Sequence, residues 1–172
     1  MGIMKRPFES TDLEKVQKFD CGDAEYEREV ELWIKGSGAG VDCAVNSMDR
    51  AERPSRVWLY ELSDALVGYG ALAQSEWRWL GKKDPFIPVT LIVWVGLDKS
   101  YQGKPPGPIE EKYAVQIMDD LIEEAKKDAV THPVLGLFVH KDNAKAIRLY
   151  RWYNFDDTGL TWKGGDDYIR RV

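Results

Sequence analysis

The sequence predicts a single α/β domain, covering residues 1–172, with a mixed and mostly antiparallel sheet that contains one central parallel crossover. The length of 172 residues is ordinary for one domain with a core of its own. Two apolar strands, 88–97 and 134–139, are separated by a glycine-bearing loop and a long helical pattern. A crossover of this kind makes its two strands parallel. Hairpin patterns precede and follow the crossover, so the other strands are expected to pair antiparallel, with helices flanking the sheet.

The first half of the chain combines short helices with a hairpin. Helical spacing and turn residues predict, in order, helices at 12–18 and 24–35, a short strand at 41–45, an exposed polar stretch at 46–56, and a hairpin of 57–61 and 65–73. An apolar face runs from Tyr26 to Ile34 in the second helix, and Gly36 stops that helix. Trp77 and Trp79 are expected in the connection that follows the hairpin.

The second half contains the strand that we expect at the centre of the sheet. Residues 88–97 are rich in β-branched apolar side chains on both faces, which is typical of a buried strand. Pro108, behind Gly107 as cap, is expected to begin a helix whose apolar face runs from Ala114 to Ala125. The remaining expected elements are a strand at 134–139, a helix at 143–153, and a hairpin of 155–163 and 167–171.

Composition and charge exclude several classes of function. Lys plus Arg is 24 and Asp plus Glu is 29, so the net charge is −5. This balance argues against binding of phosphate backbones over the whole surface, and nucleic acid is not the expected partner, although a local basic groove is not excluded. No apolar run approaches the roughly 20 residues of a membrane-spanning helix, and no secretory signal is visible. We therefore expect a cytoplasmic protein that has no membrane partner. Cys21, Cys43, His132 and His140 match no metal-ligand spacing, so no metal is expected.

The loop after the predicted central strand could bind an anion. Residues 93–107 place a glycine-bearing connection between a buried strand and a helix. Such a connection presents free backbone amides, and the helix dipole favours a negative group. A plain turn built from glycine and proline explains the same residues, and the segment alone does not decide between the two.

A second motif occupies residues 143–155, directly after a predicted strand. By itself the motif indicates an amphipathic helix with Asn143 as N-cap and with Leu149 and Tyr150 in the core. The two segments in this order, one crossover apart, are much more specific than either alone.

Together the segments resemble the GNAT-type N-acetyltransferases, which use acetyl-CoA. The family's closing motif, N-x-x-A-x-x-L-Y-x-x-x-G-F, is matched at Asn143, Ala146, Leu149, Tyr150 and Phe155. Asn154 replaces the glycine of that motif, and asparagine also accepts left-handed backbone angles. The family's V-x-V-x-x-x-Y-Q-G-K-type segment is matched at Val95, Leu97, Tyr101, Gln102, Gly103 and Lys104. The order of elements also fits along nearly the whole chain, so the resemblance implies a GNAT-like domain.

The resemblance also implies which residues form the site. The cofactor-binding residues that it implies are Val95, Leu97, Gln102, Gly103, Lys104, Gly107, Asn143 and Tyr150. Backbone amides in the Val95–Leu97 region would serve the thioester carbonyl, and Tyr150 would act as the catalytic residue that gives a proton to the leaving thiolate. A core aromatic with a satisfied hydroxyl is the alternative for Tyr150. The general base is not identified, because ordinary surface or structural roles explain each carboxylate or histidine considered: Glu61, Glu76, Asp98 and His140.

One departure from the family concerns the cofactor loop, Q/R-x-x-G-x-G/A. Pro105 stands where the first glycine belongs, and neither Pro105 nor Pro106 has an amide hydrogen to offer a pyrophosphate. We expect an insertion here, with amides near Lys112 and Tyr113 completing the cradle. The loop 103–107 is still expected to contact the pyrophosphate.

The function that the resemblance implies is acetyl transfer from acetyl-CoA, as co-substrate, to a primary amine of a small molecule or peptide in a ternary complex. One alternative is a GNAT-shaped module that binds a CoA thioester or a partner protein without turnover. Another is a toxin-like acetyltransferase acting on aminoacyl-tRNA, which the segment from Phe19 to Gly22 and Trp33 faintly resembles. The acyl chain length and a homodimeric state stay open.

Overall fold

The computed structural model describes residues 2–35, 55–78, 85–162 and 165–171. Within these ranges the strands form one seven-stranded sheet with the order β1-β2-β3-β4-β5-β7-β6. The strands are β1 (Met4–Pro7), β2 (Arg56–Leu62), β3 (Ala65–Arg78), β4 (Phe86–Leu97), β5 (Val134–His140), β6 (Asp156–Trp162) and β7 (Gly165–Arg171). Only β4 and β5 pair in parallel, so the predicted mixed sheet with a central crossover is confirmed.

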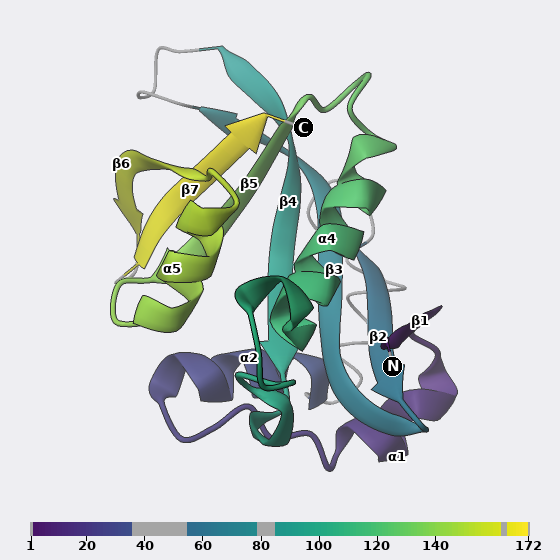
Figure 1. The fold of residues 1–172 in the computed structure, drawn as a ribbon. Helices are drawn as coiled ribbons and strands as arrows, with labels where there is room; N and C mark the ends of the chain where they lie inside the picture. The colour runs from purple at the N-terminus through teal and green to yellow at the C-terminus, as the bar shows by residue number, and fades with distance from the viewer. Residues whose placement is uncertain (1, 36–54, 79–84, 163–164, 172) are drawn as a thin grey trace.

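Helices cover both faces of the sheet (Figure 1). On one face lie α4 (Tyr113–Lys126) and α5 (Ala144–Trp152), whose apolar side chains form a single core with inward residues of the strands, such as Leu72 and Leu135. On the other face, α1 (Leu13–Val16) and α2 (Glu25–Lys35) pack Val16 and Ile34 against Leu59 and Tyr69. None of the described helices is both long and apolar enough to cross a membrane.

Most predicted elements are present with boundaries shifted by one or two residues. Larger differences concern the helix at 12–18, the second strand of the first hairpin and the start of the long helix, and one strand was not predicted. The helix expected at 12–18 is a 3-10 turn, Ser10–Asp12, followed by the single turn of α1. The first β-hairpin turns tightly at Ser63 and Asp64, both with positive φ, and β3 then continues through Trp77, which we expected in a connection. Strand β1 was not predicted, because the exposed segment Met4–Pro7 has no apolar alternation and is a strand only through its pairing with β2. The strand expected at 41–45 and Trp79 lie outside the described residues.

The long helix begins later than predicted. Pro108 starts only the 3-10 turn Ile109–Glu111, and α4 begins at Tyr113 with Lys112 as its N-cap. The prediction that Pro108 occupies the first position of this helix is therefore wrong. The Lys112 amide closes the 3-10 turn on the Ile109 carbonyl, and Lys112 itself has extended backbone angles, so the α-helix starts only after it. The apolar face that starts at Ala114 and Val115 sets where the long helix packs on the sheet.

A charged network fixes the N-terminal strand to the sheet. The Arg6 guanidinium donates to both carboxylate oxygens of Asp12 and to both of Glu61, and the Lys15 ammonium lies 2.5 Å from Glu61 Oε1. The hydrogen bonds from Arg6 hold the pKa values of the Asp12 and Glu61 carboxyl groups below their ordinary values. The network joins β1, β2 and the turn before α1.

We therefore predict that this network loses its stabilising effect in acid. A carboxyl group with a lowered pKa in the folded state stabilises the fold above its unfolded pKa, and this contribution disappears as the pH falls through the folded value. The urea midpoint should fall progressively below about pH 4.5, the ordinary value for Glu61. Substituting Arg6→Met should flatten this fall between pH 5 and pH 2 in urea titrations. An identical pH dependence in both proteins would contradict the assignment.

Candidate active site

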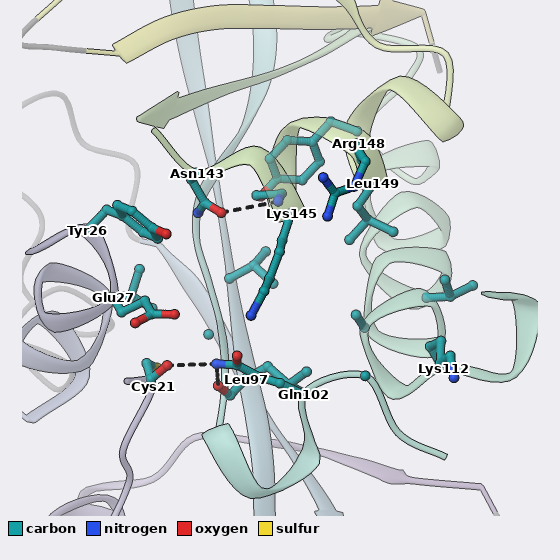
Figure 2. A pocket seen from close by; sticks show the side chains of 18 of the residues that line it. Cys21, Tyr26, Glu27, Leu97, Gln102, Lys112, Asn143, Lys145, Arg148 and Leu149 are labelled. Carbon is teal, nitrogen blue, oxygen red and sulfur yellow. Dashed lines mark hydrogen bonds between the residues drawn. The ribbon is translucent and has the colours of Figure 1, made fainter. Parts of the chain in front are cut away.

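A cavity of about 350 Å³ opens at the point where β4 and β5 separate (Figure 2). Its walls come from α2 and the segment before it, the end of β4, the loop that follows, the first turn of α4, and α5 as far as Tyr150. The lining residues are Cys21, Tyr26, Glu27, Val30, Val95, Gly96, Leu97, Gln102, Gly103, Ile109, Lys112, Ala114, Val115, Asn143, Lys145, Ala146, Arg148, Leu149 and Tyr150.

The cavity exists because the two parallel strands pair only over a short distance. Their register runs from Val89 with Val134 to Ile92 with Leu137 and stops there. At the same point β4 departs from its register with β3, between Ala71 and Leu72, so one β4 residue is left over as a bulge. Beyond the bulge β4 stays paired with β3 alone, and its other edge is open.

The open edge presents backbone amides to the cavity. The Asp98 amide donates to the Val67 carbonyl of β3 at 2.8 Å. Successive amides of a strand point to opposite sides, so those of Leu97 and Val95 point away from β3, toward the edge that β5 has left. The carbonyl of Leu97 lies on this same side, where it accepts from the Gln102 side-chain amide at 3.3 Å. This edge can pair with an extended ligand as an added strand would.

Cys21 lies beside the last of these amides and is 3% exposed. Burial raises the pKa of its thiol to about 12, the carboxylates of Glu31 and Asp98 act in the same direction, and the Leu97 backbone amide acts against them. The thiol is therefore protonated at neutral pH and is a poor nucleophile. Because the Leu97 amide faces this sulfur, the Val95 amide is the better-placed donor for a carbonyl oxygen.

In the loop after β4, residues 105–112 form an excursion whose two ends are joined by a hydrogen bond. The amide of Tyr113 donates to the Lys104 carbonyl at 2.9 Å, so the chain leaves at Lys104 and returns at Tyr113. The Lys112 ammonium holds the excursion by donating to the Pro105 carbonyl at 2.6 Å. Both prolines lie within it, which supports the predicted insertion. Its closure brings Gly103 next to the start of α4, where Gly103 and Ala114 both line the cavity.

The amides of Lys112 and Tyr113, which we expected to complete an anion cradle, already donate to backbone carbonyls. The Lys112 amide donates to the Ile109 carbonyl, and the Tyr113 amide is used at the base of the excursion. Within the described ranges, the amides of Gly103 and Ala114 have no hydrogen bond to another protein group. These two amides, one from the loop and one from the first turn of α4, are therefore the donors available to an anion.

Helix α5 forms another wall of the cavity, with polar and cationic side chains. The Asn143 side chain accepts from the Ala146 amide at 3.1 Å, so the predicted N-cap is present. Lys145 and Arg148 are exposed and line the cavity beyond this cap (Figure 2). After the helix, Asn154 takes φ of 60°, as expected for the residue that replaces the glycine of the closing motif.

The model of the acetyltransferase (GNAT) family matches residues 23–155. The chain belongs to this family. Among solved structures, a mutant of the toxin AtaT bound to the C-terminus of the antitoxin AtaR and acetyl-CoA superimposes with a TM-score of 0.68 at 16% identity, covering 99% of this chain and 94% of that one. The PaiA N-acetyltransferase of Thermoplasma acidophilum, in complex with coenzyme A, gives 0.65 at 14% identity over 100% of both chains.

A third GNAT acetyltransferase with acetyl-CoA bound, from Elizabethkingia anophelis, gives a TM-score of 0.60 at 14% identity over 99% of each chain. At these identities the likeness concerns the fold. None of the curated proteins matches the sequence significantly.

In this GNAT domain, Tyr150 of α5 lines the cavity. The residue is 9% exposed, and its ring meets that of Phe155 edge to face at 5.9 Å between centroids. Burial raises the pKa of its phenol to about 12. Within the described residues no protein group accepts from or donates to its hydroxyl, and no fully buried side-chain oxygen is left without a partner. The hydroxyl is therefore open to the cavity.

The structure brings most of the predicted site residues together. Val95, Leu97, Gln102, Gly103, Asn143 and Tyr150 line the cavity, whereas Lys104 and Gly107 do not. Gln102 acts by positioning, since its side-chain amide donates to the carbonyls of Cys21 (2.7 Å) and Leu97 and so ties two segments together.

Sequence reasoning missed the wall contributed by α2 and the cations of α5. Tyr26 was expected only on the apolar face of its helix. Glu27, Lys145 and Arg148 carry no family motif and would be taken for exposed helix positions. The carboxylates considered as bases lie elsewhere: Glu61 is held by Arg6 and Lys15, Glu76 is exposed on β3, and Asp98 accepts from the Asp20 amide. His140 stacks on Tyr26 without lining the cavity.

The two roles of Asn143 can be separated by two substitutions. Substituting Asn143→Ala removes both the cap and the side-chain amide, and should lower the free energy of unfolding by about 1 kcal/mol. Substituting Asn143→Ser keeps a capping oxygen and should leave the urea midpoint nearly unchanged, but should raise the KM for acetyl-CoA. Normal kinetics in the Ser variant would restrict Asn143 to the cap.

Proposed function

We propose that the protein is an acetyl-CoA-dependent N-acetyltransferase that acts on a primary amine of a small molecule or peptide by direct attack in a ternary complex. The observation that carries this proposal is the convergence of three groups on one cavity. The open edge of β4 offers the Val95 amide, the base of the loop offers the amides of Gly103 and Ala114, and α5 offers the Tyr150 hydroxyl.

These groups suit acetyl-CoA. Its pantetheine arm would lie along the open edge of β4, in the place that a further strand would take. The pyrophosphate would meet the amides of Gly103 and Ala114 at the start of α4, where the helix dipole favours an anion. Lys112, Lys145 and Arg148 add positive charge to this side of the cavity.

The transfer then needs an oxyanion donor and a proton donor. The amine nitrogen attacks the thioester carbon, and the oxygen that becomes negative receives the hydrogen bond of the Val95 amide. The carbon–sulfur bond then breaks while the new nitrogen–carbon bond is kept, and the Tyr150 phenol gives its proton to the leaving thiolate. An acceptor that arrives as an ammonium ion releases one proton to water before it attacks, because only the neutral nitrogen has a free electron pair. After the attack the nitrogen carries one surplus proton, and this proton restores Tyr150.

The state of Cys21 supports direct attack over a covalent intermediate. A two-step route would require a protein thiolate to take the acetyl group first. Burial keeps the Cys21 thiol protonated at neutral pH, since its pKa is raised to about 12. The amine itself is then the nucleophile that reaches the thioester.

Removal of the Tyr150 hydroxyl should affect the chemical step specifically. A positioned acid contributes about 10²–10⁴-fold, so Tyr150→Phe should lower kcat by that factor while the KM for acetyl-CoA changes little. Release of free CoA thiol gives both parameters. The wild-type rate should also show no alkaline limb below about pH 10, because the phenol has a pKa of about 12.

Tyr153→Phe is the matched control for this substitution. That phenol donates to the Val115 carbonyl and to Asp119 and does not line the cavity, so its loss should affect stability more than turnover. A kcat of Tyr150→Phe within about threefold of wild type, with chemistry rate-limiting, would leave water as the proton source.

Acetyl-CoA binding should stabilise the protein in proportion to its affinity. At a hundredfold excess over Kd the stabilisation is about 2.7 kcal/mol, which raises Tm by roughly 5–10 °C for a domain of this size. Thermal unfolding with acetyl-CoA, free CoA and longer acyl-CoA thioesters would measure this shift and compare acyl chain lengths. An unchanged Tm with all of them would exclude the proposed function.

The exposed cations of α5 favour one further candidate, an aminoacyl-tRNA acetyltransferase. Lys145, Arg148 and Arg151 are all exposed on this helix, and a phosphate backbone could meet them at the cavity mouth. One solved structure similar to this chain is AtaT complexed with acetyl-methionyl-tRNAfMet. Transfer of labelled acetyl to charged tRNA, with free methionine as the comparison, would separate this candidate from the small-amine acetyltransferase.

A further inference from the structure

We infer that Glu27 and Tyr26 of α2 form the subsite for the acceptor's amino group and that this group arrives as an ammonium ion. The inference rests on the proposed acetyl transfer and adds the class of acceptor, a cationic primary amine. It is carried by the charges on the two walls of the cavity, by the geometry of the Glu27 carboxylate and by the packing of Tyr26.

Charges of opposite sign line opposite walls of the cavity. Glu27 supplies the only carboxylate among its described lining residues, on the α2 side. The lining cations Lys112, Lys145 and Arg148 belong to the start of α4 and to α5 (Figure 2). The phosphates of a CoA thioester are therefore attracted to the α4 and α5 side and repelled from α2, where a positive group is favoured instead.

The Glu27 carboxylate is fixed by one oxygen and free at the other. Its Oε2 accepts from the Ala24 amide at 3.0 Å, which holds the side chain at the start of α2. A Cβ at Gly22 would come within 2.2 Å of this oxygen, so the carboxylate occupies space that only a glycine at position 22 leaves open. In the described part of the chain, Oε1 has no protein hydrogen-bond partner, and the carboxylate points into the cavity (Figure 2).

Tyr26 supplies an aromatic wall beside this carboxylate. Its ring stacks on the His140 imidazole at 5.6 Å between centroids and 28° between planes, and His140 ends β5. The stack fixes the ring across the gap between the strands, because α2 and β5 each hold one partner. An ammonium ion is attracted both by a carboxylate and by the face of an aromatic ring.

Apart from Glu27, the lining that comes from α2, the segment before it and the end of β4 is apolar or uncharged, and the Lys145 side chain reaches from α5 toward the middle of the cavity (Figure 2). Val30, Val95, Gly96 and the neutral Cys21 thiol surround the carboxylate side of the cavity. Attraction between a carboxylate and an ammonium ion is stronger where water is displaced by such groups than it is on an open surface. A neutral amine of the same shape would gain none of this attraction, so the subsite selects acceptors by charge.

Helix capping is the competing explanation for Glu27, and a conservative substitution separates the two. Substituting Glu27→Gln keeps an oxygen that can accept from the Ala24 amide but removes the negative charge. Glu29→Gln is the matched control, because Glu29 carries the same charge on the same helix, is exposed, and lies outside the cavity.

The experiment measures thiol release from acetyl-CoA with butylamine, 1,4-diaminobutane and benzylamine as cationic acceptors and aniline as an acceptor that is uncharged at neutral pH. A hydrogen-bonded charge is worth about ten- to a hundredfold, so Glu27→Gln should raise the KM for the cationic amines by that factor. Glu29→Gln should behave as wild type, the KM for aniline should not change, and the Tm shift with acetyl-CoA should be the same in all three proteins.

Each contrary outcome has its own meaning. Equal KM values for the cationic amines in Glu27→Gln and Glu29→Gln would overturn the subsite while leaving acetyl transfer in place. Binding of acetyl-CoA without thiol release for any cationic amine of the panel would also overturn it. A wild-type protein that acetyl-CoA does not stabilise would overturn the proposed function, and the subsite with it.

Discussion

The site depends on the early end of hydrogen bonding between the two parallel strands. Pairing of β4 with β5 stops after Ile92 and Leu137, and a bulge in β4 at the same point lets the strands diverge. In an ordinary sheet, every amide of a central strand is consumed by a neighbouring strand. Here the last residues of β4 keep one edge open in the middle of the molecule, where an extended ligand can supply the missing partners.

The elements around this gap perform two tasks each. Asn143 caps α5 while its side chain lines the cavity, and Tyr150 packs on Phe155 while its hydroxyl remains open to the same space. Glu27 caps the start of α2 with one oxygen and faces the cavity with the other. The contacts that pack and cap these elements therefore also hold the groups of the site in fixed positions.

The excursion after β4 shows how a departure from the family's loop is accommodated. Prolines at 105 and 106 cannot donate to an anion, yet the hydrogen bond from Tyr113 to Lys104 closes the excursion and returns the chain to the site. The helix then begins where its apolar face begins, and the amides at its start stay near Gly103. A loop can therefore lengthen outward without displacing the donors at its base.

The sequence by itself determined the class of fold, the central strand, the order of elements and the residues that match the GNAT motifs. These rest on local periodicity and on spacing within single segments, as in the strand near 88–97 and the helix after Asn143. The tertiary structure alone decided that β1 is a strand, that α4 starts at Tyr113, and that Tyr26, Glu27, Lys145 and Arg148 share a cavity. Such facts depend on strand pairing and on which helix faces meet across the gap, and contacts between distant segments leave no periodic pattern in the chain.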